Sequence, residues 1–361
     1  MQVLILTNLY PSDRHPARGT FIHSQVRSLT SSGVKTHVLT IEGWRSRLAY
    51  LRAVAQLRRE IRSSHYDLIH AHYGFSGWIA LCQKTVPVVI SFMGDDLLGT
   101  PGSDGSIQAT SRLYAWINRK VARRYDAVIV KSKEMHARLG LSDAHVVPNG
   151  VDMDLFRQID QSTALRHLNL HRGPARILFA ADPAIPGKRY ELACRAVDIL
   201  GERRACELHT VYGRPQEELV YWLNACDALI LPSKSEGSPN IVKEAMACNL
   251  PVVATCVGDV VSLFARCPGN RVVPCAQGAA AQASGAERCA SALADALGAV
   301  LTSGRTDCRD AMADLSMEAV ARRLCSIYEG VLAGGSKQAP RRGDRSARST
   351  TDSERLRCKH I

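Results

Sequence analysis

The sequence predicts an α/β protein of two Rossmann-like domains, each a mostly parallel sheet covered by helices, facing each other across a central cleft. Two observations support this prediction. Short apolar, β-branched segments alternate with amphipathic helical segments along the chain, which is the order that builds parallel sheets with helices on both faces. The length of 361 residues exceeds what one hydrophobic core usually holds and suits two such domains.

The predicted strands are rich in apolar and β-branched residues, and the predicted helices repeat apolar residues at helical spacing. In the first half the strands are expected at 2–8, 34–41, 67–71, 86–92, 126–131 and 144–148, with helices at 17–32, 45–63, 74–84 and 106–124. In the second half the strands are expected at 176–181, 206–211, 227–232, 251–254 and 270–273, with helices at 188–201, 215–225, 239–248, 286–302 and 316–333. Sheets of this kind bind ligands at the carboxyl ends of their strands, so a site is expected in the loops there.

The chain divides into three parts. The turn signal Pro148-Asn149-Gly150 closes the first series of strands, and the boundary between an N-terminal domain, 1–165, and a C-terminal domain, 166–333, is expected soon after it. The last part, 334–361, has few large apolar residues and is expected to be a basic, disordered tail. The helix at 316–333 is expected to pack back across the domains through Val320, Leu324, Ile327 and Leu332.

The composition is that of a globular protein without a membrane span. Hydrophobic residues make up 46% and charged residues 22%, and no run of eighteen apolar residues occurs. The segment Met1–Asn8 lacks a basic region and a cleavage site, so a buried strand and a cytoplasmic location are expected. The twelve cysteines are scattered without a C-x-x-C pair, which favours free thiols and argues against a structural zinc site.

Positive charge is concentrated in the N-terminal part of the chain. The net charge is +12, of which residues 1–165 carry +7, residues 166–336 carry none and residues 337–361 carry +5. Such a surface attracts nucleic acid, anionic lipid or phosphorylated substrates, and because no nucleic-acid fold signature occurs, nucleic acid is not expected as a partner. The basic helix from Arg45 to Arg62 is most simply a packed helix with a solvated face. Peripheral contact with an anionic membrane, at the inner membrane surface, is the alternative interpretation.

The most informative segment is 227–248, where an apolar strand, a loop and a helix follow one another. Ser238 is predicted to cap the helix and Pro239 to be its first residue. Free backbone N–H groups at 239–241 and the positive helix end then form an anion site that fits a diphosphate. Glu244, inside the helix, could accept hydrogen bonds from a ribose diol, and Glu236, in the loop, could face a transferred sugar.

Two glutamates eight residues apart are by themselves weak support, because such pairs occur often by chance and usually are solvated surface carboxylates. The strand, loop and capped helix around them favour a functional site. The segment resembles the donor-site signature of glycosyltransferase family 4, and further similar segments occur in order over roughly residues 1–333. These segments are Pro11–Gly33, Tyr66–His72, Val146–Phe156 and Asn249–Asp259.

The resemblance implies the GT-B fold, with the acceptor held by the first domain and a nucleotide-diphosphate sugar bound by the second. It also implies retention at the anomeric carbon and no required metal or other cofactor. Glu236 and Lys188 would be catalytic, with Lys188 neutralising the diphosphate and Glu236 contacting donor-sugar hydroxyls. The other implied donor-binding residues are Gly237, Ser238, Pro239, Asn240 and Ile241 through their backbone, Glu244 at the ribose, and Gly19, which would let the first domain approach the leaving group.

Two positions depart from the family pattern. The arginine that often precedes the lysine of the diphosphate site is missing, so either Lys188 acts with Arg189 or the phosphate site is built differently. Met93 stands where many members have a histidine facing the reaction centre, and a thioether cannot donate a strong hydrogen bond or a proton. The candidates for the acceptor side are His72, Asp95 and Asp96.

Other metal-like patterns have simpler explanations. Asp152-Met153-Asp154 resembles a metal-binding D-x-D sequence, but it follows a Pro-Asn-Gly turn, which favours a turn role. His70 and His72 alternate along a predicted strand and are expected at a strand end lining the cleft. No metal site is therefore predicted.

Three functions remain open from the sequence. The first is transfer of a hexose from a uridine- or guanosine-diphosphate donor to a glycan or lipid-linked acceptor. The second is a nucleotide-sugar epimerase, because such enzymes use a similar pair of domains, although no convincing set of proton-abstracting side chains is found. The third is a nucleotide-sugar-binding protein without turnover, favoured by Met93 and the missing arginine and opposed by Lys188, Glu236 and Glu244.

Overall fold

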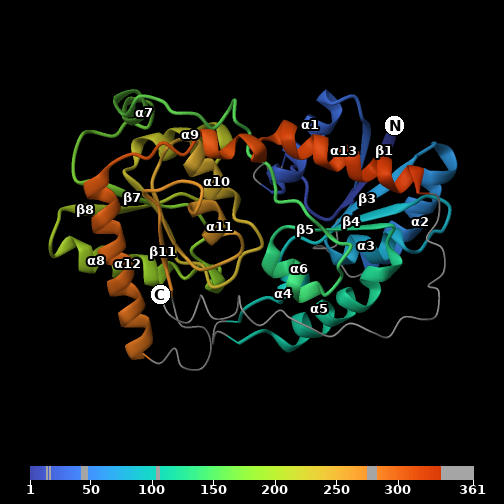
Figure 1. The fold of residues 1–361 in the computed structure, drawn as a ribbon, viewed down its shortest axis with the longest axis horizontal. Coiled ribbons are helices and arrows are strands. Elements are labelled where there is room, and N and C mark those ends of the chain that lie inside the picture. The colour runs from blue at the N-terminus through green and yellow to red at the C-terminus, as the bar shows by residue number, and fades with distance from the viewer. Residues whose placement is uncertain (14, 16–17, 42–47, 103–105, 275–282, 335–361) are drawn as a thin grey trace.

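The computed structural model describes residues 1–13, 15, 18–41, 48–102, 106–274 and 283–334. Predictions for the tail beyond Gly334 and for the start of the basic helix, 45–47, lie outside these residues. Two α/β domains lie side by side, each with its own sheet (Figure 1). Among the described helices none is both long and apolar enough to cross a membrane.

The first sheet has six parallel strands in the order β2-β1-β3-β4-β5-β6. The strands are β1 (Gln2–Thr7), β2 (Lys35–Thr40), β3 (Leu68–His72), β4 (Val88–Ser91), β5 (Ala127–Val130) and β6 (His145–Val146). The helices between them are α1 (Thr20–Ser31), α2 (Leu48–Ser63), α3 (Gly74–Ala80), α4 (Asp95–Leu98), α5 (Ala109–Val121) with a 3-10 turn (Ala122–Arg124), and α6 (Lys133–Leu139).

The second sheet has five parallel strands in the order β11-β10-β9-β7-β8. Its strands are β7 (Ala175–Phe179), β8 (Cys206–Thr210), β9 (Ala228–Leu231), β10 (Val252–Thr255) and β11 (Arg271–Val273). The accompanying helices are α7 (Gln161–His167), α8 (Tyr190–Gly201), α9 (Gln216–Ala225), α10 (Asn240–Ala247), α11 (Val260–Phe264) and α12 (Ala283–Ser303), with 3-10 turns at Pro186–Lys188 and Asp310–Leu315. The last helix of the chain is α13 (Met317–Ala333).

The predicted fold class is confirmed, and each predicted strand and helix is present with its ends shifted by a few residues. Four short helices, α4, α6, α7 and α11, were not predicted. They contain four to seven residues, which is too short for an apolar repeat at helical spacing to show.

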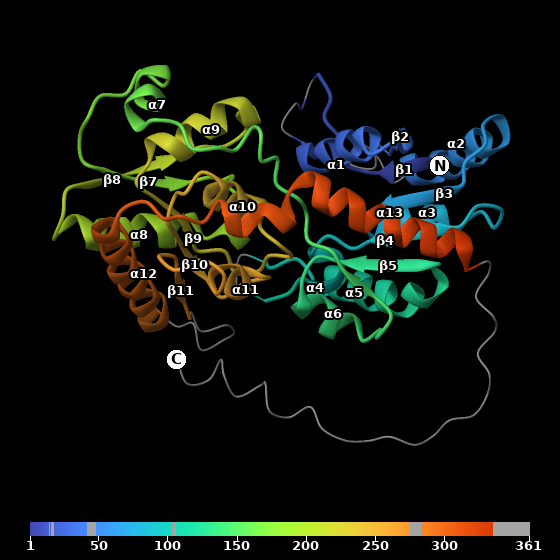
Figure 2. The ribbon, with the colours of Figure 1, turned by 45° about the horizontal axis from the view of Figure 1, so that its top comes forward.

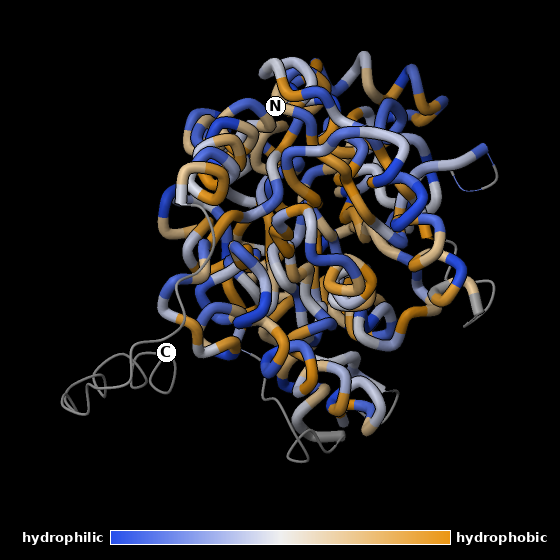
Figure 3. Tube along the Cα trace, turned by 90° about the vertical axis from the view of Figure 1, so that its right-hand side faces the viewer, coloured by the Kyte–Doolittle hydropathy of each residue, from blue (hydrophilic) through white to orange (hydrophobic). Residues whose placement is uncertain are grey.

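The central strands of each sheet are buried on both faces. In β1, Leu4 and Leu6 belong to one hydrophobic cluster, whereas Val3 and Ile5 belong to the cluster on the opposite face, as alternation along a strand requires. Figure 3 shows the hydrophobic positions concentrated on the interior segments. This two-sided burial explains why the strands are nearly continuous apolar runs.

The last helix, α13, returns to the first domain, where it lies beside α1 (Figures 1 and 2). Val320, Leu324 and Ile327 contact the first sheet's core, as predicted. Leu332, also predicted to pack, is 40% exposed and does not. The return is fixed by Tyr328, whose hydroxyl lies 2.6 Å from Nδ1 of the buried His70.

The chain crosses between the domains twice, and the two crossings are paired. Val151 N donates to Leu315 O at 2.9 Å, and Met317 N donates to Val151 O at 3.0 Å. The close pairing favours glycine at position 150, because a Cβ atom there would lie 3.0 Å from Cα of Met317. Any movement of one domain against the other therefore bends a two-stranded connection.

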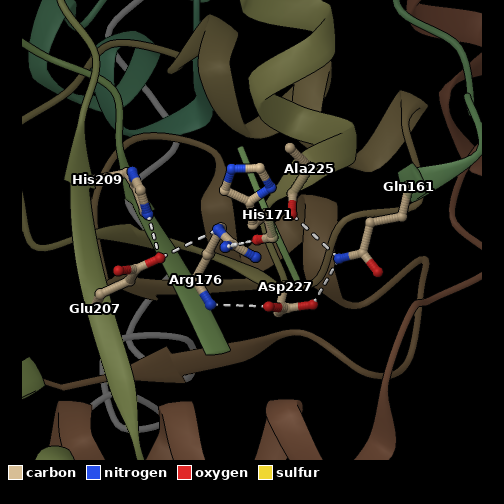
Figure 4. Close-up of polar contacts among 7 residues, drawn as sticks. All are labelled: Gln161, His171, Arg176, Glu207, His209, Ala225 and Asp227. Carbon is tan, nitrogen blue, oxygen red and sulfur yellow. Dashed lines mark hydrogen bonds and ion pairs between the residues drawn. The ribbon is translucent and has the colours of Figure 1, made fainter. Parts of the chain in front are cut away.

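At the amino ends of the second sheet, away from the interdomain face, polar side chains satisfy one another (Figure 4). The buried Arg176 side chain donates to His171 O and lies 3.1 Å from Glu207. The Asp227 carboxylate accepts from Arg176 N at 2.8 Å and from Gln161 Nε2 at 2.9 Å. The group joins β7, β8, β9 and α7 and has a structural role.

The expectation of free cysteines is wrong for Cys267, Cys289 and Cys308, which are disulfide-bonded. Cys267 and Cys308 form a disulfide with their Cα atoms 5.3 Å apart. The two residues are 41 positions apart in the sequence. Asn270 joins their segments, because its Nδ2 donates to Cys267 O at 3.2 Å and to Cys308 Sγ at 3.3 Å. Seven other cysteines in the described part of the chain carry free thiols.

Candidate functional site

A cavity of about 350 Å³ lies between the domains, at the carboxyl ends of β7, β8 and β9. This is the edge at which open parallel sheets bind ligands. Most of its wall comes from the second domain, and Thr20 and Met93 close it from the first. The second-domain wall consists of Ala180, Ala181, Lys188, Val211, Tyr212, Gly213, Arg214, Gln216, Leu219, Glu236, Gly237, Ser238, Pro239, Asn240, Ile241 and Glu244.

The start of α10 faces this cavity, as predicted, but its capping differs from the prediction. The helix begins at Asn240 with Pro239 at the cap position. Ser238 does not cap it, because its hydroxyl donates to Asp259 Oδ2 at 2.6 Å and accepts from Lys243 Nζ at 2.8 Å. Pro239 has no N–H group and so cannot be one of the predicted backbone donors. Unsatisfied N–H groups and the positive helix end remain available to an anion at Asn240 and Ile241.

Lys188 and Glu236 form an ion pair in the cavity wall. Lys188 Nζ lies 2.6 Å from Glu236 Oε1, and the side chains are 29% and 14% exposed. The loop that carries Glu236 is held beside the Pro186–Lys188 turn by a hydrogen bond of 2.8 Å from Lys234 N to Gly187 O. The sequence predicted both residues at the site but not that the carboxylate orients the ammonium.

Arg189 does not contribute to the cavity, contrary to the prediction. Its side chain donates from Nε to Pro232 O at 2.7 Å and from Nη2 to Ser233 O at 3.2 Å. The guanidinium thus holds the end of β9, where it adds to the hydrogen bond that Ser233 O accepts from Thr255 Oγ1. Of the two adjacent cations, only Lys188 faces the cavity.

Glu244 lies at the base of the cavity on α10 and is 8% exposed. Burial raises the pKa of its carboxyl to about 7, an effect that the neighbouring Lys243 partly opposes. Within the part of the chain that the structure describes, its carboxylate makes no hydrogen bond. A buried carboxylate with unused acceptor sites is suited to a diol of a bound ligand.

The loop after β4 brings the first domain into contact with the loop of the second domain that contains Gly237. A Cβ atom on Gly237 would overlap the main-chain oxygen of Met93, so only glycine allows this approach. Asp96 shapes the loop, because its carboxylate accepts from Met93 N at 3.0 Å and Gly94 N at 2.9 Å. Burial raises the pKa of Asp96 to about 6. Asp96 therefore supports the loop and does not line the cavity.

Asp95 belongs to the first domain and lies close to the Lys188–Glu236 pair of the second domain. Burial raises the pKa of its carboxyl, the negative charge of Glu236 adds to this, and Lys188 opposes it. Its Oδ2 accepts from Thr100 Oγ1 at 3.2 Å. Among the predicted acceptor-side residues, Asp95 is the one placed to influence a group bound beside Glu236.

His72 is not in the cleft, contrary to the prediction. It is fully buried, with Nε2 3.0 Å from Gln25 Nε2, and burial lowers its pKa well below the usual value, so the ring is neutral. His70 is also buried, between Tyr328 and Ser91. The described residues contain no group of three or more His, Cys, Asp or Glu side chains arranged to bind a metal.

Gly19 is required for the packing of the first domain. It has φ of 71° at the start of α1, and a Cβ atom would lie 2.6 Å from the carbonyl of Leu9. Gly19 itself does not line the cavity. The next residue, Thr20, does.

The sequence assigned no role to two parts of the site. Tyr212, Gly213 and Arg214, in the loop after β8, form one end of the cavity, and a glycine between a predicted strand and a predicted helix was the available signal. Lys243 is fully buried behind the cavity wall. Its position inside an apolar helical repeat could have identified it as a buried charge.

Two family models match the chain. One, described as a glycosyl transferase 4-like domain, matches residues 1–150, and the other, described as glycosyl transferases group 1, matches residues 186–302. Among curated relatives, the chain is 27% identical over 335 residues to a Bacillus subtilis protein described as the teichuronic acid biosynthesis glycosyltransferase TuaC, covering 74% of this chain and 84% of that protein. The chain is also 28% identical over 260 residues to a D-inositol 3-phosphate glycosyltransferase of Streptomyces scabiei. This match covers 59% of this chain and 57% of that protein.

Solved structures share the fold. Sucrose-phosphate synthase of Thermosynechococcus elongatus superposes with a TM-score of 0.73 at 17% identity, covering 93% of this chain and all of that one. HepE of Anabaena, in complex with UDP and glucose, superposes with a TM-score of 0.61 at 14% identity, covering 91% of this chain and all of that one. The two matched models and the relatives identify this chain as a glycosyltransferase of the family 4 type, and the solved structures share its GT-B fold.

Proposed function

We propose that this glycosyltransferase moves a hexose from a nucleoside-diphosphate sugar to a glycan or lipid-linked acceptor, with retention and without a metal. The observation that carries the proposal is the convergence of Lys188, Glu236, Glu244 and the start of α10 on one cavity wall. Each supplies a group that a nucleoside-diphosphate sugar needs.

The roles follow from charge and position. The ammonium of Lys188 and the N–H groups at the start of α10 supply positive charge where a diphosphate leaving group develops negative charge, which stabilises the transition state. Glu244 accepts hydrogen bonds from the ribose diol. Glu236 orients Lys188 and accepts from hydroxyls of the donor sugar.

The comparisons guide the choice of ligands. HepE was solved with UDP and glucose, and TuaC is described as acting in teichuronic acid biosynthesis. We therefore propose a uridine-diphosphate hexose as the first donor to test and a growing glycan as the first acceptor class.

The test has two steps. Thermal unfolding is measured with UDP, GDP, ADP and their glucose conjugates, because a ligand that binds only the folded state stabilises it, by about 2.7 kcal/mol at one hundred times its Kd. The stabilising nucleotide sugar is then incubated with the enzyme alone and with acceptor glycans. Slow hydrolysis of the donor in the incubation without acceptor, together with sugar transfer in the incubation with acceptor, would support the proposal. A changed sugar without acceptor would identify an epimerase, and binding without turnover would identify a degenerate site.

Stereochemistry and metal dependence are tested on the same reaction. Nuclear magnetic resonance of the product should show the anomeric configuration of the donor. EDTA should leave the rate unchanged, since Lys188 and α10 supply the positive charge. An inverted product, or activity lost with EDTA and restored by a divalent ion, would contradict this part of the proposal.

We also propose that the first domain contacts anionic membranes through α5. This helix exposes Leu113 and Trp116, which are 55% and 50% accessible, and Lys120 Nζ lies 6.0 Å from the Trp116 ring centroid. The segment Ala109–Arg124 carries five basic and no acidic residues. Exposed aromatic and aliphatic side chains beside basic ones suit an anionic lipid surface.

Sedimentation with vesicles tests this contact. The wild type should bind vesicles of phosphatidylglycerol and phosphatidylcholine and should not bind phosphatidylcholine alone. The double substitution Leu113→Ser and Trp116→Ser should abolish binding, whereas Leu332→Ser, at an exposed position on α13, should not. Equal binding of the α5 variant and the wild type would contradict the proposal.

A further inference from the structure

Lys243 is a fully buried lysine behind the cavity wall. Its side chain on α10 has no exposed surface, and its ammonium donates to Asn149 O at 2.8 Å and to Ser238 Oγ at 2.8 Å. The Ser238 hydroxyl in turn donates to Asp259 Oδ2 at 2.6 Å. Burial lowers the pKa of Lys243, whereas the nearby Asp259 and Glu244 carboxylates raise it.

The residues bonded to Lys243 belong to different functional segments. Ser238 lines the cavity in the donor loop, defined as Glu236–Asn240. Asn149 lies in the first crossing between the domains, two residues before Val151, which pairs with the second crossing. A second bond joins the same segments, from Asn149 Nδ2 to Asn240 Oδ1 at 3.2 Å. The ammonium therefore connects the donor loop to the interdomain connection.

Stability alone does not account for a lysine here. Removing an ammonium from water costs several kcal/mol, and replacing a buried ion pair by apolar residues of similar volume is often neutral or stabilising. Methionine has nearly the same length and would fill the same space. What methionine lacks is the pair of directed bonds to Asn149 and Ser238.

The donor loop is also confined on its other sides. Gly237 touches the Met93 main chain of the first domain, and a Cβ atom on Gly258 would lie 2.8 Å from Gly237 O. A displacement of the crossing at Asn149 moves an acceptor of the ammonium, and the ammonium holds Ser238. The loop position is thus tied to the relative position of the domains.

We propose that Lys243 is a positioning residue that couples movement of the interdomain connection to the donor loop, so that domain closure and donor binding assist each other. Hinged domains often close on ligands in this way. The inference rests on the proposed function, because the donor loop must bind the nucleotide sugar. Lys243 acts through Ser238 and Asn149 and does not itself touch the substrate.

The test uses the full chain with Lys243→Met alone and combined with Asp259→Asn. The single variant leaves the Asp259 carboxylate buried without its countercharge and is expected to lose stability. Asparagine at 259 removes that charge and still accepts from Ser238, so the double variant should regain the wild-type melting temperature. Lys84→Met, at an exposed position, is the matched control and should behave like the wild type.

The decisive measurements on the double variant are kinetic and conformational. With UDP-glucose as the probe, kcat/KM for donor hydrolysis should fall about 10- to 100-fold, since misplacement by about 1 Å can cost this much. Small-angle scattering should show compaction by UDP in the wild type and Lys84→Met but not in the double variant. Wild-type kinetics and compaction in a stable double variant would overturn the role of Lys243 while leaving the proposed function intact. Absence of UDP-glucose binding and turnover in the wild type would instead remove both.

Discussion

Lys188 and Glu236 form an ion pair across 2.6 Å in the interdomain cavity, although 48 residues separate them in the sequence. The pair joins the loop after β7 to the loop after β9. Because both side chains are mostly buried, solvent screens their interaction less than it screens a surface pair. The relationship makes Glu236 an orienting group for the cation as well as a candidate sugar ligand.

Replacing Glu236 should therefore reduce turnover more than binding. Glu236→Gln removes the charge that holds Lys188 but keeps the side-chain shape, so kcat for UDP-glucose should fall about 100-fold, the scale of losing one transition-state contact. The Kd for UDP should change less than threefold. Steady-state kinetics and calorimetry measure the two quantities. Glu217→Gln, on the exposed side of α9, is the control, and equal losses in both variants would contradict the role of Glu236.

The raised pKa of the Glu244 carboxyl predicts that donor affinity depends on pH. Burial raises its pKa to about 7, and only the carboxylate accepts hydrogen bonds through both oxygens. Affinity for UDP-glucose, whose diphosphate does not titrate near neutrality, should increase from pH 6 to pH 8. In Glu244→Gln the affinity should be weaker and should lose this part of the pH dependence. A pH profile that is identical in the two proteins would contradict the placement of the ribose at Glu244.

The same shift predicts how pH affects stability without ligand. The folded-state pKa of Glu244 is raised above the model-peptide value of 4.5, so the folded protein binds more protons than the unfolded chain between these values. The contribution of Glu244 to stability is therefore fully present below pH 4.5 and is lost as pH rises through about 7. Urea unfolding should show wild type losing stability relative to Glu244→Gln across this window. A constant difference between the two proteins would contradict the buried carboxyl.

Gly237 should be sensitive to a single added methyl group. A Cβ atom there would overlap the main-chain oxygen of Met93, so Gly237→Ala should push the domains apart and lower kcat/KM for the donor at least tenfold. The control Gly201→Ala, where a Cβ meets nothing within 4 Å, should keep full activity and gain up to about 1 kcal/mol of stability. Scattering would report the separation of the domains. Full activity in Gly237→Ala would show that this interdomain contact is not needed for turnover.

The disulfide predicts a measurable stabilisation. A cross-link between positions 41 apart restricts the unfolded chain, and the loop-entropy relation gives about 4 kcal/mol. Cys267→Ser with Cys308→Ser should lower the free energy of unfolding by roughly this amount, and a reductant should also destabilise the wild type. Cys82→Ser, at an exposed free thiol, is the control. A wild type unaffected by reductant would show that the bond is absent in solution.

Local patterns were enough to predict the alternation of strands and helices and the position of Glu236 and Glu244 beside one strand end, whereas the GT-B fold and Lys188 were implied by the family resemblance. Buried parallel strands must be apolar on both faces, and the helices between them must have one apolar face, so both leave a periodic record in the sequence. The strand, loop and helix from β9 through α10 placed Glu236 and Glu244 on one edge, because parallel strands end together at the same side of a sheet. These features depend on residues close to one another in the chain.

Partner choice among polar side chains was decided only by the tertiary structure. Ser238 suits a helix cap locally, yet Lys243 and Asp259 offer its hydroxyl charged partners. Arg189 lies beside Lys188 in sequence, yet its guanidinium serves carbonyls at the end of β9. His72 belongs to a strand expected to reach the cleft, but the fold buries it beside Gln25. A buried polar group must bond with whatever the fold brings within reach, and a single sequence does not state which distant residues those are.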